Sequence, residues 1–251
     1  MKLILLFTIL ILCNSCASLD VAKLSQNELL FTSYEDDSDE LLKLFFERWQ
    51  NDVQHQDINK INSDTLKIIY DIFSAIYNPV DKYFYLPNYP HIKNDPGIQN
   101  APDFSDLYIV IQNKLFYLIT DSLSSIRNMT DYDLSSNYLK ILKVIEDFRP
   151  EINVSSKIVY LSTKYENIIK DFLNESDLFE NENKIKFIGR IGNISGGITN
   201  STYPLVQMIK LNSSFNEAIV SLAFQFGGSE VLLKRVEYEW KIIDIKQTWI
   251  M

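Results

Sequence analysis

The chain contains little cysteine, histidine or glycine, and each scarcity excludes a class of function. Both cysteines, Cys13 and Cys16, lie near the N-terminus, so no disulfide framework can stabilise the rest of the chain and a hydrophobic core must do so. The two histidines, His55 and His91, lie in separate segments without paired spacing, which excludes an ordinary zinc site. The seven glycines form neither a dinucleotide fingerprint nor a phosphate-binding loop, so we expect no nucleotide and no cofactor.

Basic residues are outnumbered by acidic ones, which excludes nucleic acid as an expected partner. The chain has 24 Lys and Arg against 33 Asp and Glu, a formal net charge of -9. Nucleic-acid binding depends on clustered basic side chains, and the one close pair, Lys234-Arg235, lies in a predicted strand. The acidic residues between positions 35 and 40 are interpreted as a solvated linker end and helix start, not as a metal site.

Long apolar runs are absent apart from one at the N-terminus. Lys2 precedes a run from Leu3 to Leu12, which is too short to cross ~30 Å of hydrocarbon, because that takes roughly 20 apolar residues. A small residue, Ser15, directly precedes Cys16. This arrangement predicts an export signal over residues 1–15, with Cys16 as a lipidation site.

The same segment resembles the signal of bacterial lipoproteins. The resemblance implies a diacylglycerol on the Cys16 sulfur and an acyl chain such as palmitate on its new amino group, which together anchor the protein almost permanently. It further implies an extracytoplasmic location, at a bacterial outer membrane, with the membrane as a partner through this lipid. The pattern departs at Cys13, where the family usually has Leu. Ordinary secretion with cleavage nearby is the alternative.

The remaining sequence is expected to form a tether and one α+β body. Residues 16–37 are polar and aperiodic, which is typical of a tether that lifts a folded body off a membrane. The body then covers residues 38–251, with possible sub-lobes over 38–150 and 151–251. Its N-terminal part is expected to be a helix pair and a hairpin, and its C-terminal part an antiparallel meander covered by helices.

Helical spacing of apolar residues predicts the main helices. One begins after Ser38 and a second runs from Ser63 to Tyr77, and the two are expected to pack together as a pair. A third helix begins after Ser162 or Thr163. Residues 134–148 have an ambiguous period that favours a helix over a strand.

Strands are predicted in two regions. Residues 107–120 form two β-rich stretches around positions 112–114, which predicts a hairpin. Alternation in the last third predicts about five strands joined by short turns, with Gly227-Gly228 as one hairpin turn and residues 237–239 as the next connection. The predicted strands are 185–191, 205–211, 217–226, 230–236 and 240–249.

Residues 217–250 resemble the closing strands of cystatin-like and NTF2-like α+β domains. In those families a strand of small and apolar residues is followed by a glycine turn, a second strand and a final strand opened by Trp. The matching positions are Ala218, Val220, Phe224, Gly228, Val231 and Trp240 to Ile242. The whole chain is also similar to uncharacterised lipoproteins of Gram-negative bacteria, and neither resemblance implies a catalytic residue.

The long segment over residues 78–106 carries the candidate ligand-binding residues. It holds five of the seven prolines and a group of aromatic side chains, and loops of this length in compact domains are usually functional or disordered. The candidates are Tyr83, Phe84, Tyr85, Tyr89 and His91. Their rings can stack on a sugar or receive a peptide side chain, or they can simply close the core, which is the role expected for the three tryptophans. A calcium site from the acidic and amide side chains at positions 94–106 is a further alternative.

No motif identifies a reaction, so the function expected is non-enzymatic binding of a protein or glycan at the bacterial envelope. The alternatives are a carboxylate-dependent glycan hydrolase, which needs only two suitably separated acids, and a structural envelope protein. Asp64 and Asp71 share a helix face but are expected to be solvated.

Overall fold

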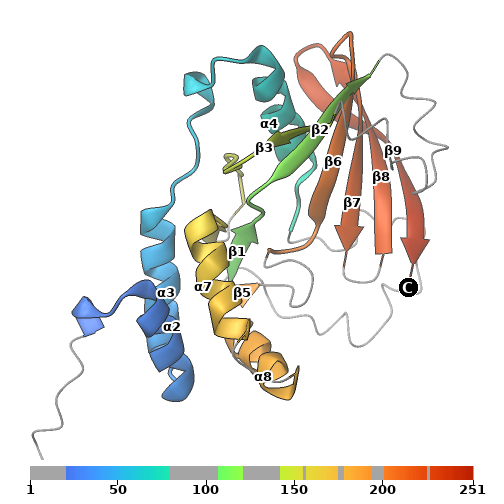
Figure 1. Cartoon of the computed structure of the whole chain (residues 1–251). Helices are drawn as coiled ribbons and strands as arrows, with labels where there is room; N and C mark the ends of the chain where they lie inside the picture. The colour runs from blue at the N-terminus through green and yellow to red at the C-terminus, as the bar shows by residue number, and fades with distance from the viewer. Residues whose placement is uncertain are drawn as a thin grey trace, which may run out of the picture.

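Two β-sheets and a layer of helices make up the fold (Figure 1). The computed structural model describes residues 21–79, 107–120, 142–154, 157–174, 178–193, 201–224 and 227–250. The helices are η1 Val21–Lys23, α2 Gln26–Glu35, α3 Asp39–Asp52, η2 Ile58–Lys60, α4 Asp64–Ile76, α7 Thr163–Asn174 and α8 Leu178–Ile188. The strands are β1 Tyr108–Ile111, β2 Leu115–Thr120, β3 Lys143–Ile145, β4 Lys157–Tyr160, β5 Gly192–Asn193, β6 Leu205–Asn212, β7 Glu217–Phe224, β8 Gly227–Val236 and β9 Glu239–Ile250. The predicted α+β class is confirmed.

Serine caps begin helices α2, α3 and α4. Ser38 and Ser63 each accept a hydrogen bond from the backbone N–H three residues on, which confirms the predicted starts of α3 and α4. Ser25 caps α2 in the same way, and the Ser25 N–H donates to the Glu28 carboxylate, which completes a capping box. These caps satisfy amide groups that a helix leaves without internal partners.

The aperiodic tether predicted over residues 16–37 is wrong in its second half. Residues 26–35 form α2, whose Leu29 and Leu30 are fully buried against α3 and α7. The helix was missed because its apolar residues are few and weakly segregated, so that its capping box and burial, and not amphipathic spacing, hold it in place.

A small parallel sheet, with strand order β4-β1-β5, lies at the centre of the molecule. All four residues of β1 are buried, because one of its faces meets the helical layer and the other meets the core under the large sheet. The hairpin predicted over residues 107–120 is therefore wrong, since β1 and β2 belong to different sheets. Fully buried strands show no alternation, and this made the two stretches look like partners.

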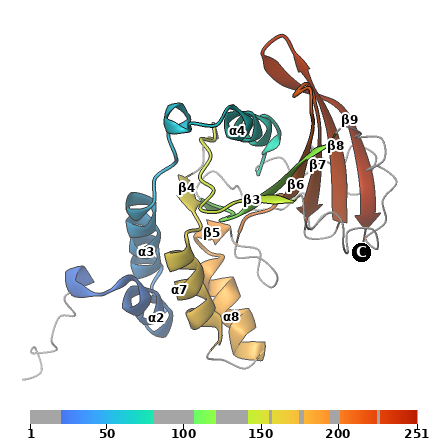
Figure 2. The same cartoon turned by 45° about the horizontal axis from the view of Figure 1, so that its top comes forward.

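The large sheet has the order β3-β2-β6-β7-β8-β9 (Figure 2). Strands β6 to β9 form the predicted antiparallel meander, and β2 joins it by parallel pairing with β6. Residues 237–238 form the tight turn between β8 and β9. Gly227 and Gly228 lie inside β8 and are not the turn that they were predicted to be.

Two further assignments are corrected. Residues 185–191, predicted as a strand, lie mostly in α8. Within residues 134–148, predicted as a helix, the described part contains strand β3, which pairs with β2.

Two hydrophobic cores lie on opposite faces of the small sheet. One fills the space between α2, α3, α7 and α8 and the sheet, and the other lies between α4 and the large sheet. The predicted pairing of α3 with α4 is therefore wrong, because α3 packs on α2 and α4 packs on the meander. Each core contains residues from both sides of position 150.

The prediction that tryptophans close the core is confirmed for Trp49 and Trp240. Trp49 and Trp240 are buried, one in each core. The side chain of Trp249 lies outside the described residues. Asp64 and Asp71 are exposed, as predicted.

Candidate functional site

The candidate site lies at the carboxyl edge of the small parallel sheet, where ligands commonly bind in α/β folds. Ile111 and Tyr160, the last residues of β1 and β4, are partners in register. Asn113 and Ser162 each follow two residues later, and α7 begins at the next residue after Ser162. The pairing of the two strands thus brings Asn113, Ser162 and the first turn of α7 to one edge.

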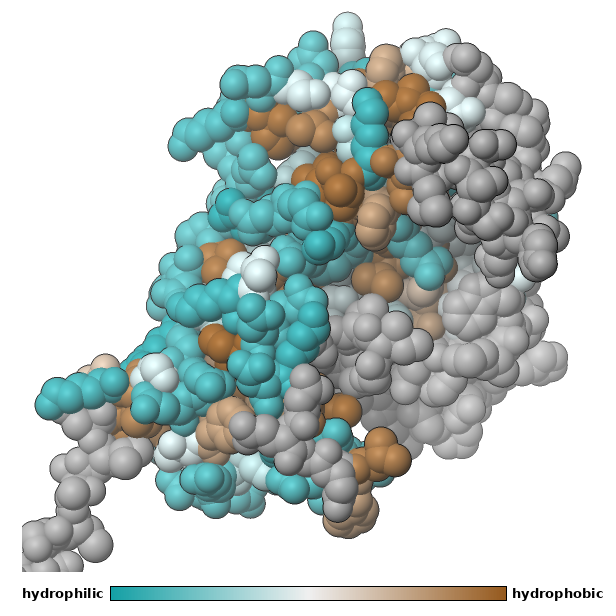
Figure 3. All heavy atoms as spheres, viewed as in Figure 1, coloured by the Kyte–Doolittle hydropathy of each residue, from teal (hydrophilic) through white to brown (hydrophobic). Residues whose placement is uncertain are grey.

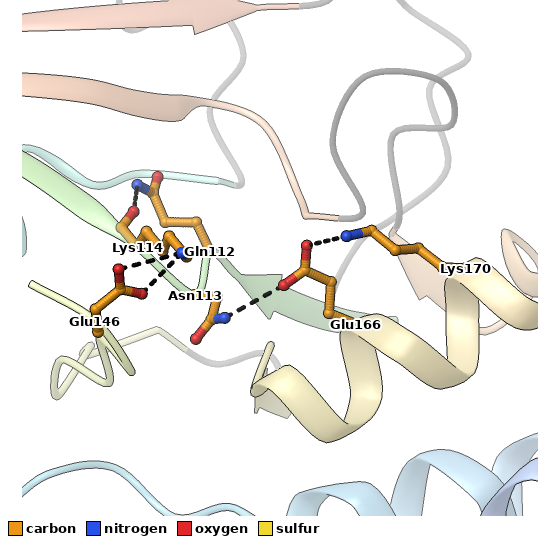
Figure 4. Close-up of polar contacts among 6 residues, drawn as sticks. All are labelled: Gln112, Asn113, Lys114, Glu146, Glu166 and Lys170. Atoms are coloured by element: carbon orange, nitrogen blue, oxygen red, sulfur yellow. Dashed lines mark hydrogen bonds and ion pairs between the residues drawn. The ribbon is translucent and has the colours of Figure 1, made fainter. Parts of the chain in front are cut away.

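Gln112 fixes the position where the chain passes from the small sheet to the large one. Its side-chain amide donates to the carbonyls of Lys114, at 2.6 Å, and of Val206, at 2.8 Å. The Val206 N–H donates in turn to Gln112 Oε1 at 2.9 Å. The Gln112 side chain therefore bonds to both backbone groups of Val206, as a neighbouring strand would. These bonds hold the chain at Gln112 and so fix the position of the next residue, Asn113 (Figure 4).

Asn113 is 6% exposed and has one unused acceptor. Its backbone carbonyl accepts from the Phe148 N–H at 2.8 Å, and its side-chain amide donates to Glu166 Oε2 at 3.3 Å. Its Oδ1 atom is buried without a hydrogen-bond partner, and the same is true of Ser162 Oγ. Buried polar atoms are nearly always paired, so these two oxygens can accept or share hydrogen bonds with a water or a small polar ligand.

Two ion pairs flank Asn113, one on each side (Figure 4). Lys114 Nζ lies 2.9 Å from Glu146 Oε2, and Lys170 Nζ lies 2.7 Å from Glu166 Oε1. The hydrogen bond from Lys170, with smaller contributions from Asn113 and Lys114, lowers the pKa of Glu166. Glu146 in turn raises the pKa of Lys114. Glu166 is therefore ionised at neutral pH, so it can accept hydrogen bonds but cannot serve as a general acid there.

Replacing Glu166 by Gln should destabilise the fold at neutral pH by about 0.5–1.5 kcal/mol and have little effect in acid. The folded-state pKa is lowered, so the stabilisation is present above the unfolded-state pKa, about 4.3, and is lost as the pH falls through the folded value. Urea unfolding of both proteins between pH 7 and pH 3 measures the difference.

Glu182 is the matched control for this measurement. It also pairs with a lysine four residues on, Lys186, at 2.7 Å, but both side chains are exposed on α8. Glu182→Gln should leave stability unchanged within error at every pH. Equal effects of the two substitutions would mean that Asn113 and the partial burial of Glu166 add nothing to its pair with Lys170.

A second polar network lies on the other side of α7, where α2 and α3 meet it. The Tyr165 hydroxyl donates to Asp52 at 2.7 Å and accepts from the Gln26 amide at 2.6 Å, while Lys164 pairs with Asp52 at 2.7 Å. Burial, followed by the bond to Asp52, raises the pKa of Tyr165, and the bonds from Lys164 and Tyr165 lower that of Asp52. These contacts hold three helices together, and their role is structural.

The structure does not describe the residues that were predicted to bind a ligand. Cys16 and the group Tyr83, Phe84, Tyr85, Tyr89 and His91 lie outside the described residues. Over the described ranges, no group of three or more His, Cys, Asp or Glu side chains is placed to hold a metal ion. None of the described helices has the length and apolar character needed to cross a membrane.

No family model, curated protein or solved structure matches this chain. The resemblance of residues 217–250 to cystatin-like and NTF2-like domains therefore stays a prediction, as does the lipoprotein signal.

Asn113, Ser162 and Glu166 were missed at the sequence level, although a signal was present. The segments Tyr-Ile-Val-Ile-Gln-Asn, at 108–113, and Lys-Ile-Val-Tyr-Leu-Ser, at 157–162, each place a polar residue two positions after a short run of β-branched and aromatic residues. Such runs are typical of parallel strands buried on both faces. Reading both segments in that way would have placed Asn113 beside Ser162.

Proposed function

We propose that the protein is a lipid-anchored extracytoplasmic domain of the bacterial envelope that acts by binding, without catalysis. The observation that carries the proposal is the N-terminal sequence, in which Lys2, the apolar run to Leu12 and Ser15 precede Cys16. A signal of this length is removed on export, and the acyl chains on Cys16 then hold the body at a membrane.

The polar edge of the small sheet supports binding as the activity. Two buried oxygens, Asn113 Oδ1 and Ser162 Oγ, have no partner, and the Glu166 carboxylate beside them is ionised. A ligand suited to this edge donates hydrogen bonds, as the hydroxyl groups of a glycan or the amides of a peptide do. Acceptor oxygens held in place by the fold favour binding of a ligand that presents hydroxyl or amide donors.

The acids of the described chain give the hydrolase alternative no support. A glycosidase needs a general acid with a raised pKa beside a second carboxyl group. Among the described carboxyls, partial burial raises the pKa of Asp71, but its charged neighbour is Arg235, which lowers it. Asp71 lies on the exposed face of α4, which packs on the large sheet, whereas Glu166 lies on α7, which packs on the opposite face of the small sheet.

Replacing Cys16 by Ala should release the protein from the membrane fraction. Wild-type protein should carry acyl chains at a mature N-terminus that begins at Cys16, as measured by mass spectrometry of the N-terminal peptide. Cys13→Ala is the matched control, because Cys13 is lost with the signal, and this variant should stay acylated and membrane-bound. An unmodified Cys16, or cleavage at another position, would overturn the anchor.

A further inference from the structure

The first turn of α8 exposes two large apolar side chains next to each other. Leu178 is 91% exposed and Phe179 is 74% exposed, whereas most large apolar side chains of the helical layer are buried. The α8 helix and η1, the first described element, both lie in the lower half of the molecule in the two ribbon views (Figures 1 and 2). Brown atoms mark the same lower edge in the space-filling view (Figure 3).

Val21, the first residue of η1, follows Cys16 by five residues in the sequence. Arg48, on α3, donates hydrogen bonds of 2.8 Å to the carbonyls of Val21 and of Leu24, and so fastens the start of the chain to the helical layer. Five residues span at most about 18 Å when fully extended. An anchored body therefore stays close to the bilayer, and the end carrying η1 must face it.

The charges on α8 indicate which kind of lipid surface this end can meet. Lys184 and Lys186 are paired with Glu180 and Glu182, so α8 offers no unpaired basic cluster for anionic headgroups. Arg190 is likewise paired with acids of the α2–α3 corner. Contact with a bilayer must therefore come from apolar side chains and favours neutral headgroups.

We propose that Leu178 and Phe179 insert into the same bilayer that holds the lipid on Cys16, so that the body docks on the membrane in one orientation. The proposal rests on the proposed function, because it needs the anchor. Two side chains of this size add a modest affinity by themselves, roughly tenfold each if fully inserted. The acyl chains on Cys16 already attach the protein to the membrane. The added affinity of Leu178 and Phe179 therefore determines how the body is oriented on it.

The experiment measures the lipidated mature protein before and after addition of phosphatidylcholine vesicles. An introduced cysteine carries an environment-sensitive nitrobenzoxadiazole label. Phe179→Cys carries the label at the proposed contact. Tyr238→Cys is the matched control, because Tyr238 is 90% exposed in the β8–β9 turn, at the opposite end of the molecule (Figure 1). Each label is unique, since Cys13 is removed with the signal and the Cys16 sulfur is blocked.

On adding vesicles, the emission of the label at position 179 should rise and shift to the blue, and that at position 238 should not change. Flotation with vesicles and an unshifted label at position 179 would overturn the docking and leave the anchor standing. A shift at position 179 without vesicles would mean burial against protein, which also overturns it. Failure to float would overturn the proposed function, and the docking with it.

Discussion

Gly192→Ala should lower the free energy of unfolding by about 1–3 kcal/mol, because there is no space for a methyl group at this position. A Cβ atom on Gly192 would lie 2.2 Å from Cζ of Phe46 and 2.8 Å from its Cε1. Phe46 cannot easily move away, since it is fully buried and stacked on Tyr108 at 5.0 Å and on Trp49 at 5.6 Å between ring centroids. Urea unfolding followed by circular dichroism measures the loss.

Two further variants test whether Phe46 is the cause. In Gly189→Ala the new Cβ meets the Ile185 carbonyl oxygen at 3.2 Å, within the end of α8, so the loss should be much smaller. Combining Gly192→Ala with Phe46→Leu should cost less than the sum of the two single changes, because the smaller side chain relieves the overlap. Additive costs would show that the clash is not with Phe46.

The elements predicted correctly are those whose stability comes from local features. Helices α3 and α4 have serine caps followed by a continuous apolar face, and the meander β6 to β9 has alternating residues with short connections. Both patterns can be seen within one element or two adjacent ones. They are therefore accessible without knowledge of the rest of the fold.

The errors occur where long-range contacts decide the structure. Residues 185–191 were predicted as a strand, but Lys184, Phe187 and Ile188 are buried at helical spacing, and Phe187 and Ile188 pack in the core of the helical layer, which favours α8. In the same way, β1 was assigned to a hairpin because its pairing partners, β4 and β5, follow much later in the chain. Local periodicity carries no information on such pairing.

The candidate site could not be predicted for the same reason. Asn113 was expected in a turn, and Ser162 was considered only as a helix cap. They share an edge only because β1 pairs in parallel with β4, a contact that spans a long stretch of sequence. Composition pointed to the aromatic segment, which stays a prediction, and composition does not show which polar atoms elsewhere become buried without partners.

Trp49→Ala should be the most damaging single substitution in the described core, with a loss of about 3–5 kcal/mol. Trp49 is fully buried, its ring is stacked on Tyr165 at 4.5 Å and 4°, and its indole N–H donates to the Tyr160 carbonyl at 2.8 Å. The side chain thereby joins α3 to α7 and to the edge strand β4. Its removal leaves a cavity and also an unpaired buried carbonyl.

Trp49→Phe separates these two contributions. Phenylalanine keeps part of the stacking on Tyr165 but cannot donate a hydrogen bond to the Tyr160 carbonyl. Trp49→Phe should therefore lose about half as much stability as Trp49→Ala, because a smaller cavity and one unmade hydrogen bond remain. Because Tyr160 ends β4 just before Ser162, we also expect amide hydrogen exchange to rise in β4 more than in the meander. A uniform rise over both sheets would show that the two cores unfold together and that Trp49 does not specifically hold the edge of the candidate site.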